Sequence, residues 1–225
     1  FHQERDILNE AQSKTAIGTT GKGIGPTYCD KVGRIGIRVC DLYDLDALES
    51  RLFERKDLDE SQVKSIIKLL KSCASKILPF IADSTNLLWQ AQSSGQKILL
   101  EGAQGSMLDI DHGTYPFVTS STTIASGACS GSGLPPKAIN KVIGIAKAYC
   151  TRVGNGAFPS EEFGEIGELL RQKGAEFGTT TGRARRCGWF DAVAARYACK
   201  LNGCDEIALM KLDVLDGFEE VKVCV

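Results

Sequence analysis

The chain has 225 residues, of which 43% are hydrophobic and 24% are charged, and its formal net charge is −1. This composition is typical of a globular protein and excludes a disordered or fibrous one. A net charge near zero also argues against nucleic acid as a partner. No apolar run approaches the roughly 20 residues that a membrane-spanning helix needs, so a membrane partner is not expected either.

The cysteines indicate a reducing compartment. There are nine of them, they are irregularly spaced, and no Cys-x-x-Cys pair occurs. An odd number does not suit a disulfide framework, and with only His2 and His112 available a structural zinc site is not expected. We therefore expect buried free thiols in a cytoplasmic protein.

The first half of the chain predicts a glycine-rich segment followed by helices. Glycine is dense between residues 16 and 40, which is typical of loops where the backbone approaches a ligand. Helical spacing of apolar residues then predicts helices over residues 45–56, 60–78 and 83–92. Asp44 is placed to cap the first, Pro79 interrupts the second, and Gly95 ends the third.

The second half predicts strands alternating with loops. Short apolar runs predict strands at 97–101, 141–152, 207–210 and 219–225, with a helix at 189–201 that ends near Gly203. For 141–152 a helix stays open as the alternative. Strand, helix and loop in rotation predict an α/β fold, with a mostly parallel sheet, flanking helices and long ligand-binding loops.

The first loop suited to a ligand runs from Gly18 to Gly25 as GTTGKGIG. Successive glycines let backbone N–H groups converge on an anion, while the hydroxyls and the lysine add donors. The residue order is not that of a Walker A loop. On composition alone a flexible surface turn is equally probable, but the basic residues that follow, Lys31, Arg34 and Arg38, favour phosphate.

The second loop begins with EGAQG at residues 101–105 and continues with DIDHGTYP at 109–116 and TSSTT at 119–123. The Gln104 amide can both donate to and accept from a base or carbonyl edge. Asp109, Asp111 and His112 could form a metal site or an acid–base pair. Turn-capping aspartates are the better interpretation of these residues taken alone.

The third and fourth loops also suit charged or purine ligands. FGTTTGRARR at 177–186 combines hydroxyls with guanidiniums that can grip carboxylate or phosphate. A solvated basic turn or an RNA-binding arm is the alternative, weakened by the low net charge and the lack of interleaved aromatics. In Lys211-Leu212-Asp213, the carboxylate can accept the guanine N1–H and exocyclic amine together, which adenine cannot offer. A salt bridge at the end of a strand is the commoner role of a Lys-x-Asp sequence.

Taken in order, four segments resemble the motifs of the adenylosuccinate synthetase family: GTTGKGIGPTYCDKVGRIGIRV, EGAQGSMLDIDHGTYPFVTSS, GTTTGRARRCGWFD and KLDVLDG. The resemblance implies a ligase that joins IMP and L-aspartate to adenylosuccinate through 6-phosphoryl-IMP at the expense of GTP, the first committed step from IMP to AMP. It also implies Mg²⁺, a homodimer, a cytoplasmic location and a fold related to the P-loop NTPases.

The resemblance covers nearly the whole chain and implies the central portion of one domain. A helical segment would cover residues 43–95, and a strand and loop segment with the substrate and guanine loops would cover 96–225. The family's N-terminal Gly-Asp-Glu-Gly-Lys-Gly loop and its Gly-Gly-His-Asn-Ala-Gly-His segment, which carry the catalytic Asp and His, are absent. We therefore expect a fragment that is inactive alone, with no metal ligand of its own and with the Mg²⁺ ligands in the missing N-terminal part. His112 is assigned no catalytic role.

The resemblance also assigns site residues. IMP would bind Thr20, Arg34, Gln104, Thr119 and Arg183, with Arg34 reaching the IMP of the partner subunit. Aspartate would bind Thr179, Thr180, Thr181, Gly182, Arg183, Ala184 and Arg185, and GTP would bind Arg185, Lys211, Leu212 and Asp213. The catalytic candidates are Gln104, at the reactive edge of IMP, and Lys31, which matches the signature lysine of the family and whose role stays open.

Two other hypotheses belong to different classes of protein. One is a degenerate relative that binds nucleotides without catalysis, and the other is an RNA-binding protein that uses the arginines from Arg183 to Arg186, with a steep salt dependence. We also expect a fragment to expose sheet edges and apolar surface and therefore to be poorly soluble.

Overall fold

The structure is a computed structural model that describes residues 1–14, 16–178 and 182–225. The helices are α1 His2–Gln12, α2 Ile24–Val32, α3 Leu45–Phe53, α4 Glu60–Ile77, α5 Ser84–Ser93, α6 Ala125–Ser132, α7 Glu165–Lys173 and α8 Ala192–Asn202. The strands are β1 Ile143–Lys147, β2 Tyr149–Arg152, β3 Arg186–Asp191, β4 Glu206–Met210 and β5 Val223–Cys224. Short 3-10 helices lie at Val39–Tyr43, Leu78–Phe80, Ser106–Leu108, Pro136–Ala138 and Leu212–Leu215.

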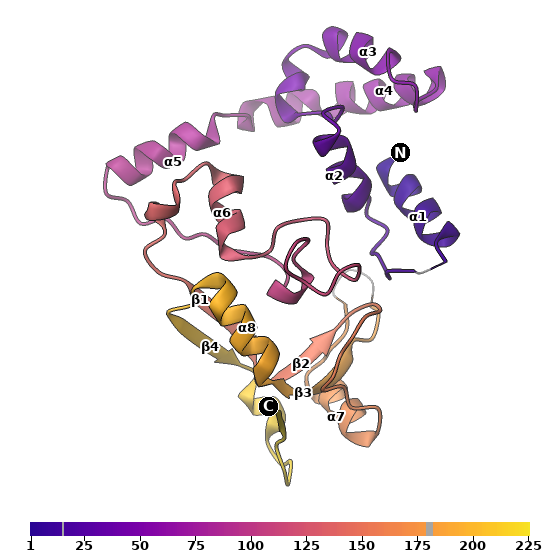
Figure 1. The fold of residues 1–225 in the computed structure, drawn as a ribbon. Helices are drawn as coiled ribbons and strands as arrows, with labels where there is room; N and C mark the ends of the chain where they lie inside the picture. Colours follow the sequence, from indigo (N-terminus) through magenta and orange to yellow (C-terminus); the bar gives the residue numbers. More distant parts are fainter. Residues whose placement is uncertain (15, 179–181) are drawn as a thin grey trace.

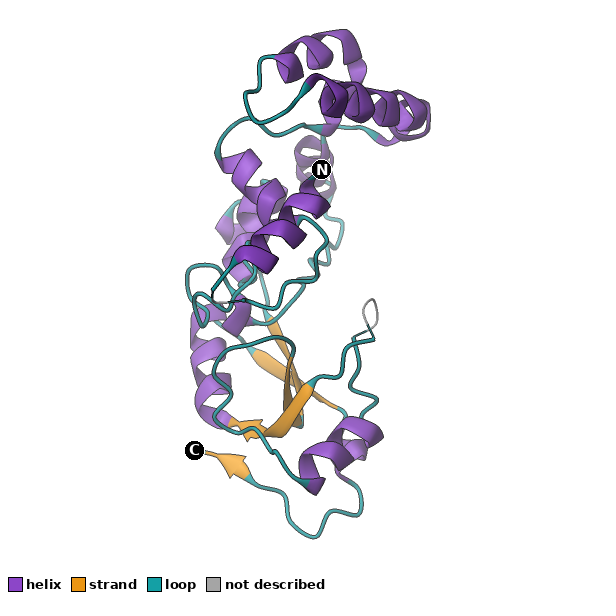
Figure 2. Ribbon diagram, turned by 90° about the vertical axis from the view of Figure 1, so that its right-hand side faces the viewer, coloured by secondary structure: helices purple, strands orange, loops and turns teal. Residues whose placement is uncertain are grey.

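The molecule is elongated, with α3 and α4 at one end and the strands toward the other (Figure 1). Figure 2 shows the same separation from the side, with further helices and long loops between the helical end and the strands. β1 and β4 are parallel, β2 and β3 are antiparallel, and β3 and β5 are parallel. The predicted α/β fold with parallel pairing is therefore confirmed. The segment 141–152 is extended and not helical, but it forms two strands, β1 and β2, that belong to different sheets.

The helical end is built as the apolar spacing predicts. Leu48 and Leu52 of α3 pack with Val63 and Ile67 of α4 in one buried cluster. The predicted cap on α3 is present, because the Asp44 carboxylate accepts the backbone N–H of residue 47 at 2.9 Å. A side-chain acceptor at this position satisfies an N–H that the first helical turn leaves unpaired.

A second buried cluster lies at the strand end. It joins Tyr149 of β2, Leu170 of α7, Cys187 of β3 and Val214 of the 3-10 helix that follows β4. The cluster fixes the chain just after Lys211 against the antiparallel pair of β2 and β3, so it places the fourth predicted loop beside the third.

Three predicted boundaries are corrected by the structure. Residues 97–101 form no strand, and Leu99 is 92% exposed. A strand needs a neighbour for its backbone hydrogen bonds, and no described segment pairs with this one. The helix expected from Trp189 begins at Ala192, because Trp189 lies in β3 and the Asp191 carboxylate caps the helix at 2.8 Å from the N–H of residue 194. In the expected strand 219–225, only residues 223–224 pair with another strand, which is β3.

The described residues include other features that the sequence analysis did not foresee. Helices α1, α2, α6 and α7 were not predicted, and the expectation of buried thiols is wrong for most cysteines. Only Cys187 is buried, while Cys29 and Cys40 are exposed, and all nine are free thiols.

Within the described residues, no helix combines the length and the apolar character needed to cross a bilayer.

Candidate functional site

The first loop folds around a carboxylate of its own chain. The backbone N–H groups of Ile17, Gly18 and Thr19 all point at the Glu10 carboxylate of α1, at 3.4, 2.5 and 3.4 Å. Gly18 has a φ of +84°, a conformation that glycine adopts without steric cost. The predicted convergence of backbone donors on an anion is therefore present, and Glu10 supplies that anion.

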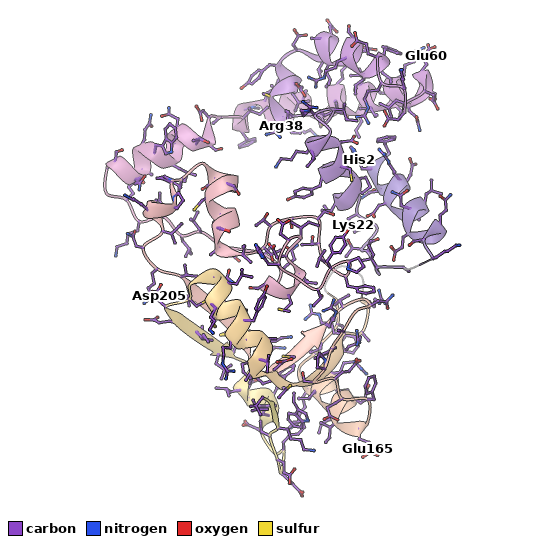
Figure 3. All side chains as sticks on the ribbon, in the orientation of Figure 1. His2, Lys22, Arg38, Glu60, Glu165 and Asp205 are labelled. Carbon is purple, nitrogen blue, oxygen red and sulfur yellow. The ribbon has the colours of Figure 1, made fainter. Side chains whose placement is uncertain are left out.

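The same loop leads directly into α2. Gly23, with a φ of +80°, begins the helix and donates its N–H to the buried Asp6 carboxylate at 2.9 Å. A Cβ at Gly23 would lie 2.7 Å from the His2 carbonyl carbon, so only glycine fits. Thr20 and Lys22 precede this turn and are exposed, and Figure 3 shows Lys22 where the loop meets α2. Their side chains are thus available to a ligand.

The first and third loops lie side by side. A Cβ built on Gly18 would lie 3.0 Å from the Cα of Gly154, in the β2–α7 connection, and 3.4 Å from the Arg183 Nη1. In the same connection, the Asn155 side-chain amide donates to the Ala16 carbonyl at 2.8 Å. The loop that carries Thr20 is therefore held next to the guanidinium of Arg183.

The second loop is organised by a buried aspartate. Asp109 is fully buried, and its carboxylate accepts the backbone N–H groups of Asp111, His112 and Thr123 at 3.0, 3.0 and 2.7 Å. Burial alone would raise the pKa of Asp109, but these donors outweigh it and hold the pKa below its usual value. The turn-capping interpretation is therefore correct for Asp109.

The second loop also contacts the first loop and the strands. Arg152 of β2 donates to the Thr114 hydroxyl at 2.9 Å and to the Phe117 carbonyl at 3.0 Å. A Cβ on Gly25, at the start of α2, would lie 3.4 Å from the Ser120 hydroxyl. Thr119, half-buried beside Ser120, is therefore close to the N-terminal end of α2.

Gln104 lies at the exposed end of this loop. It is one of the few non-glycine residues with positive φ, at +63°, and its side chain is exposed. The adjacent Gly105 carbonyl is held by the Thr123 hydroxyl at 2.9 Å. The loop is thus anchored next to Gln104 while the amide remains available.

The third and fourth loops share one buried carboxylate, which the sequence analysis missed. Glu176 is 1% exposed, and its Oε2 accepts from Arg185 Nη1 at 2.6 Å. Its Oε1 lies 2.5 Å from the Tyr149 hydroxyl, 3.0 Å from Lys147 Nζ and 3.3 Å from Lys211 Nζ. Burial opposes ionisation of Glu176, but these donors prevail and lower its pKa to about 2. Arg185 and Lys211 are thereby brought together.

Arg186 has a different role from its neighbours. Its guanidinium pairs with Glu161 and donates to the carbonyls of Gly154 and Gly156 at 3.3 and 2.9 Å. One of the three guanidiniums predicted to form an anion site therefore holds the loop together. In the same segment, Gly182 and Ala184 are exposed, whereas residues 179–181 lie outside the described residues.

Two predicted site residues lie apart from the others. Lys31 and Arg34 stand at the C-terminal end of α2, whose nine residues span about 13 Å. The Lys31 Nζ lies 5.7 Å from the centroid of the Tyr28 ring. Within the described residues, the exposed Arg34 guanidinium has no hydrogen bond or salt bridge. Arg34 therefore lies beyond the opposite end of α2 from the loop that carries Thr20.

The residues after Lys211 that are predicted to bind GTP are open to solvent. Lys211 has a φ of +60° and begins the 3-10 helix, and Leu212 and Asp213 are exposed on its first turn. Among the described residues, no three His, Cys, Asp or Glu side chains are grouped as a metal site would require.

Comparisons with known proteins identify the family to which this chain belongs. The family model described as adenylosuccinate synthetase matches residues 1–225. Adenylosuccinate synthetase of Helicobacter hepaticus is 64% identical over 100% of this chain and 57% of its own length, and that of Wolinella succinogenes is 62% identical over 98% and 56%. The structure of fully ligated adenylosuccinate synthetase from Plasmodium falciparum superposes with a TM-score of 0.90 at 39% identity, over 98% of this chain and 54% of that one. The chain spans little more than half the length of these relatives, and it belongs to the adenylosuccinate synthetase family.

Proposed function

We propose that the full-length protein containing residues 1–225 joins IMP and L-aspartate in a reaction driven by GTP. The observation that carries the proposal is the contact of the Gly18 loop with Arg183, which places the loop that carries the exposed Thr20 and Lys22 next to a guanidinium, while Glu10 occupies the backbone donors of that loop. Such a pair of groups can hold a nucleoside monophosphate at one end and a carboxylate at the other. Family membership supports the same assignment.

In this proposal IMP lies between the first three loops. Thr20 binds its 5′-phosphate, and Thr119, next to the start of α2, binds the ribose-phosphate side. Gln104 holds the reactive edge of the purine, and Arg183 contacts IMP from the third loop. The proximity of Gly18 to Arg183 and of Gly25 to Ser120 supports this placement.

Aspartate and GTP occupy the other side of the same site. The loop from Thr179 to Arg185 binds the carboxylates of aspartate, and Arg185 also serves GTP. Lys211, Leu212 and Asp213 select guanine, with the Asp213 carboxylate accepting from N1–H and the exocyclic amine. The shared contact of Arg185 and Lys211 with Glu176 supports placing the two ligands side by side.

The chemistry follows from the poor leaving ability of the C6 oxygen of IMP. As N1 of IMP gives up its proton to a base, that oxygen attacks the γ-phosphorus of GTP, which releases GDP and gives 6-phosphoryl-IMP. The amine of aspartate then attacks C6, the C6–O bond breaks, phosphate leaves with the oxygen, and the amine loses a proton. Residues that hold the reactants together and face the developing charge provide most of the catalysis in such transfers.

The described residues hold no group of three or more His, Cys, Asp or Glu side chains that could bind a metal ion. We propose that Mg²⁺ acts with GTP through ligands outside residues 1–225, and we assign it no step here. We also propose that residues 1–225 are the central portion of a single domain of a cytoplasmic homodimer, and that this portion is inactive alone.

A steady-state assay of the full-length protein tests the proposal. With IMP, aspartate and GTP, we expect adenylosuccinate, GDP and phosphate in equal amounts. Omission of any one substrate should abolish all three products. If calorimetry shows IMP and GTP binding without turnover, the non-catalytic hypothesis replaces this one.

We expect Arg34→Leu to raise the KM for IMP, because Arg34 is proposed to act on the partner's IMP. Its position at the far end of α2 supports this role. Mixing it with Gln104→Ala should restore activity, because one site of each mixed dimer then has every residue intact. At equal mixing, about a quarter of wild-type activity is expected for a symmetric dimer. Each variant alone is the control, and an inactive mixture would contradict the trans role.

A further inference from the structure

We infer that Glu176 is a positioning residue that sets the aspartate side and the guanine side of the site together. The inference rests on the proposed function, in which Arg185 and Lys211 bind these two ligands. Glu176 touches neither ligand in this account and acts through the two cations that it holds.

The geometry gives each cation its own oxygen. Glu176 Oε2 contacts Arg185 Nη1 at 2.6 Å, and Oε1 contacts Lys211 Nζ at 3.3 Å. The backbone adds to this, because the Arg185 N–H donates to the Glu176 carbonyl at 2.9 Å, and Lys211 Nζ also donates to the Gly174 carbonyl. A movement of one carboxylate would therefore displace both cations.

The carboxylate itself cannot move freely. The Tyr149 hydroxyl and Lys147 Nζ, both from the β1–β2 region, bind Oε1 at 2.5 and 3.0 Å. Tyr149 is 1% exposed and belongs to the second buried cluster. The strands thus fix Glu176, and Glu176 fixes the two loops.

The charge around Glu176 favours anionic ligands. Lys147, Arg185 and Lys211 face a single buried carboxylate, so positive charge remains in excess. The Arg185 and Lys211 side chains are 31% and 40% exposed, which leaves their outer sides open to a carboxylate or a phosphate. With a neutral residue at position 176, the three basic side chains would keep their positive charge but would no longer be held in this arrangement.

The test compares Glu176→Gln with Glu161→Gln in the full-length protein. Glu161 is a matched control because its carboxylate, 9% exposed, also pairs with an arginine of the same segment, Arg186, which is 32% exposed as against 31% for Arg185. For Glu176→Gln we expect the KM for GTP and the KM for aspartate each to rise by about tenfold or more, as expected for a misplacement of about 1 Å. The KM for IMP should change less than about twofold, and the preference for GTP over ATP should fall. Glu161→Gln should lower the melting temperature. It should leave the three KM values and the preference for GTP over ATP unchanged.

Glu176→Asp keeps the test decisive if Glu176→Gln does not fold. Aspartate retains the charge but is one methylene shorter, so it cannot reach both cations, and the paired rise of the two KM values should persist at a smaller size. Unchanged KM values for GTP and aspartate in a folded position-176 variant would overturn the inference, and so would a rise in only one of them. If the wild-type protein makes no adenylosuccinate, the proposed function fails instead, and the two failures are distinguished.

Discussion

Asp213→Asn should move the nucleotide preference of the full-length protein from GTP to xanthosine triphosphate. A carboxylate only accepts hydrogen bonds, so it suits the N1–H and the exocyclic amine of guanine. An asparagine amide presents one acceptor and one donor, which suits N1–H and the 2-oxo group of xanthine. Because a site built for a hydrogen bond rejects a mismatched partner strongly, we expect the ratio of kcat/KM values to change by about 10³-fold or more.

The measurement is kcat/KM for the two nucleotides at saturating IMP and aspartate. Asp216→Asn is the matched control, because Asp216 is also an exposed aspartate just beyond the 3-10 helix and is assigned no ligand. It should keep the preference for GTP. A variant at Asp213 that still prefers GTP would show that the guanine assignment is wrong.

Asp30→Ala is expected to lower the free energy of unfolding by about 2 kcal/mol, because the buried Arg55 guanidinium then keeps only one of its two carboxylate partners, Asp57. Asp30 is 2% exposed, and its carboxylate contacts His2 at 2.9 Å, Arg55 at 3.0 Å and Arg5 at 3.5 Å. These contacts join α1, α2 and the segment after α3, and Figure 3 shows His2 at the interface of the first two helices. Loss of Asp30 should therefore also loosen the Gly18 loop.

Asp30 also makes the stability of the protein depend on pH, and the direction of its pKa shift determines the sign of that dependence. Burial alone would raise the pKa of Asp30, but hydrogen bonds from His2 and Arg55 outweigh it and hold the pKa below its usual value near 3.8. The stabilisation is therefore complete above pH 3.8 and is lost as the pH falls through the lower folded-state pKa. Denaturant unfolding should show that the difference in the free energy of unfolding between the wild type and Asp30→Ala shrinks only in that acidic range.

Glu60→Gln is the control for this prediction. Glu60 pairs with Lys64 on the surface of α4, and both side chains are well exposed. Exposed pairs contribute little to stability, so this variant should unfold like the wild type. An equal effect from the two substitutions would contradict the role given to the buried carboxylate.

Local patterns predicted the elements that depend on neighbouring residues. Asp44 and Asp191 cap α3 and α8, and Gly203 ends α8 in the left-handed conformation, as short-range rules lead one to expect. Asp44 was identified in advance, whereas Asp191 was placed inside the predicted helix. The aromatic residues before it, Trp189 and Phe190, suit a helix or a strand equally, and pairing with β2 and β5 decides in favour of a strand.

Contacts between distant segments could not be predicted in the same way. The strand expected at 97–101 has the right composition, but no described strand pairs with it, and composition does not reveal a partner. The first loop is arranged around Glu10, and the third and fourth loops are arranged around Glu176, yet each of these residues is an ordinary glutamate in the sequence. Their roles depend on Gly18 and on Lys211, which only the folded chain brings near them.

The central claim is that IMP and GTP share one site, with the C6 oxygen of IMP next to the γ-phosphate. Its most direct test uses IMP labelled with ¹⁸O at C6, the full-length protein, aspartate and GTP, with mass analysis of the inorganic phosphate. The account predicts that each phosphate released carries the label, because the oxygen leaves with the phosphoryl group. Unlabelled phosphate would contradict it, since GTP would then be hydrolysed apart from IMP.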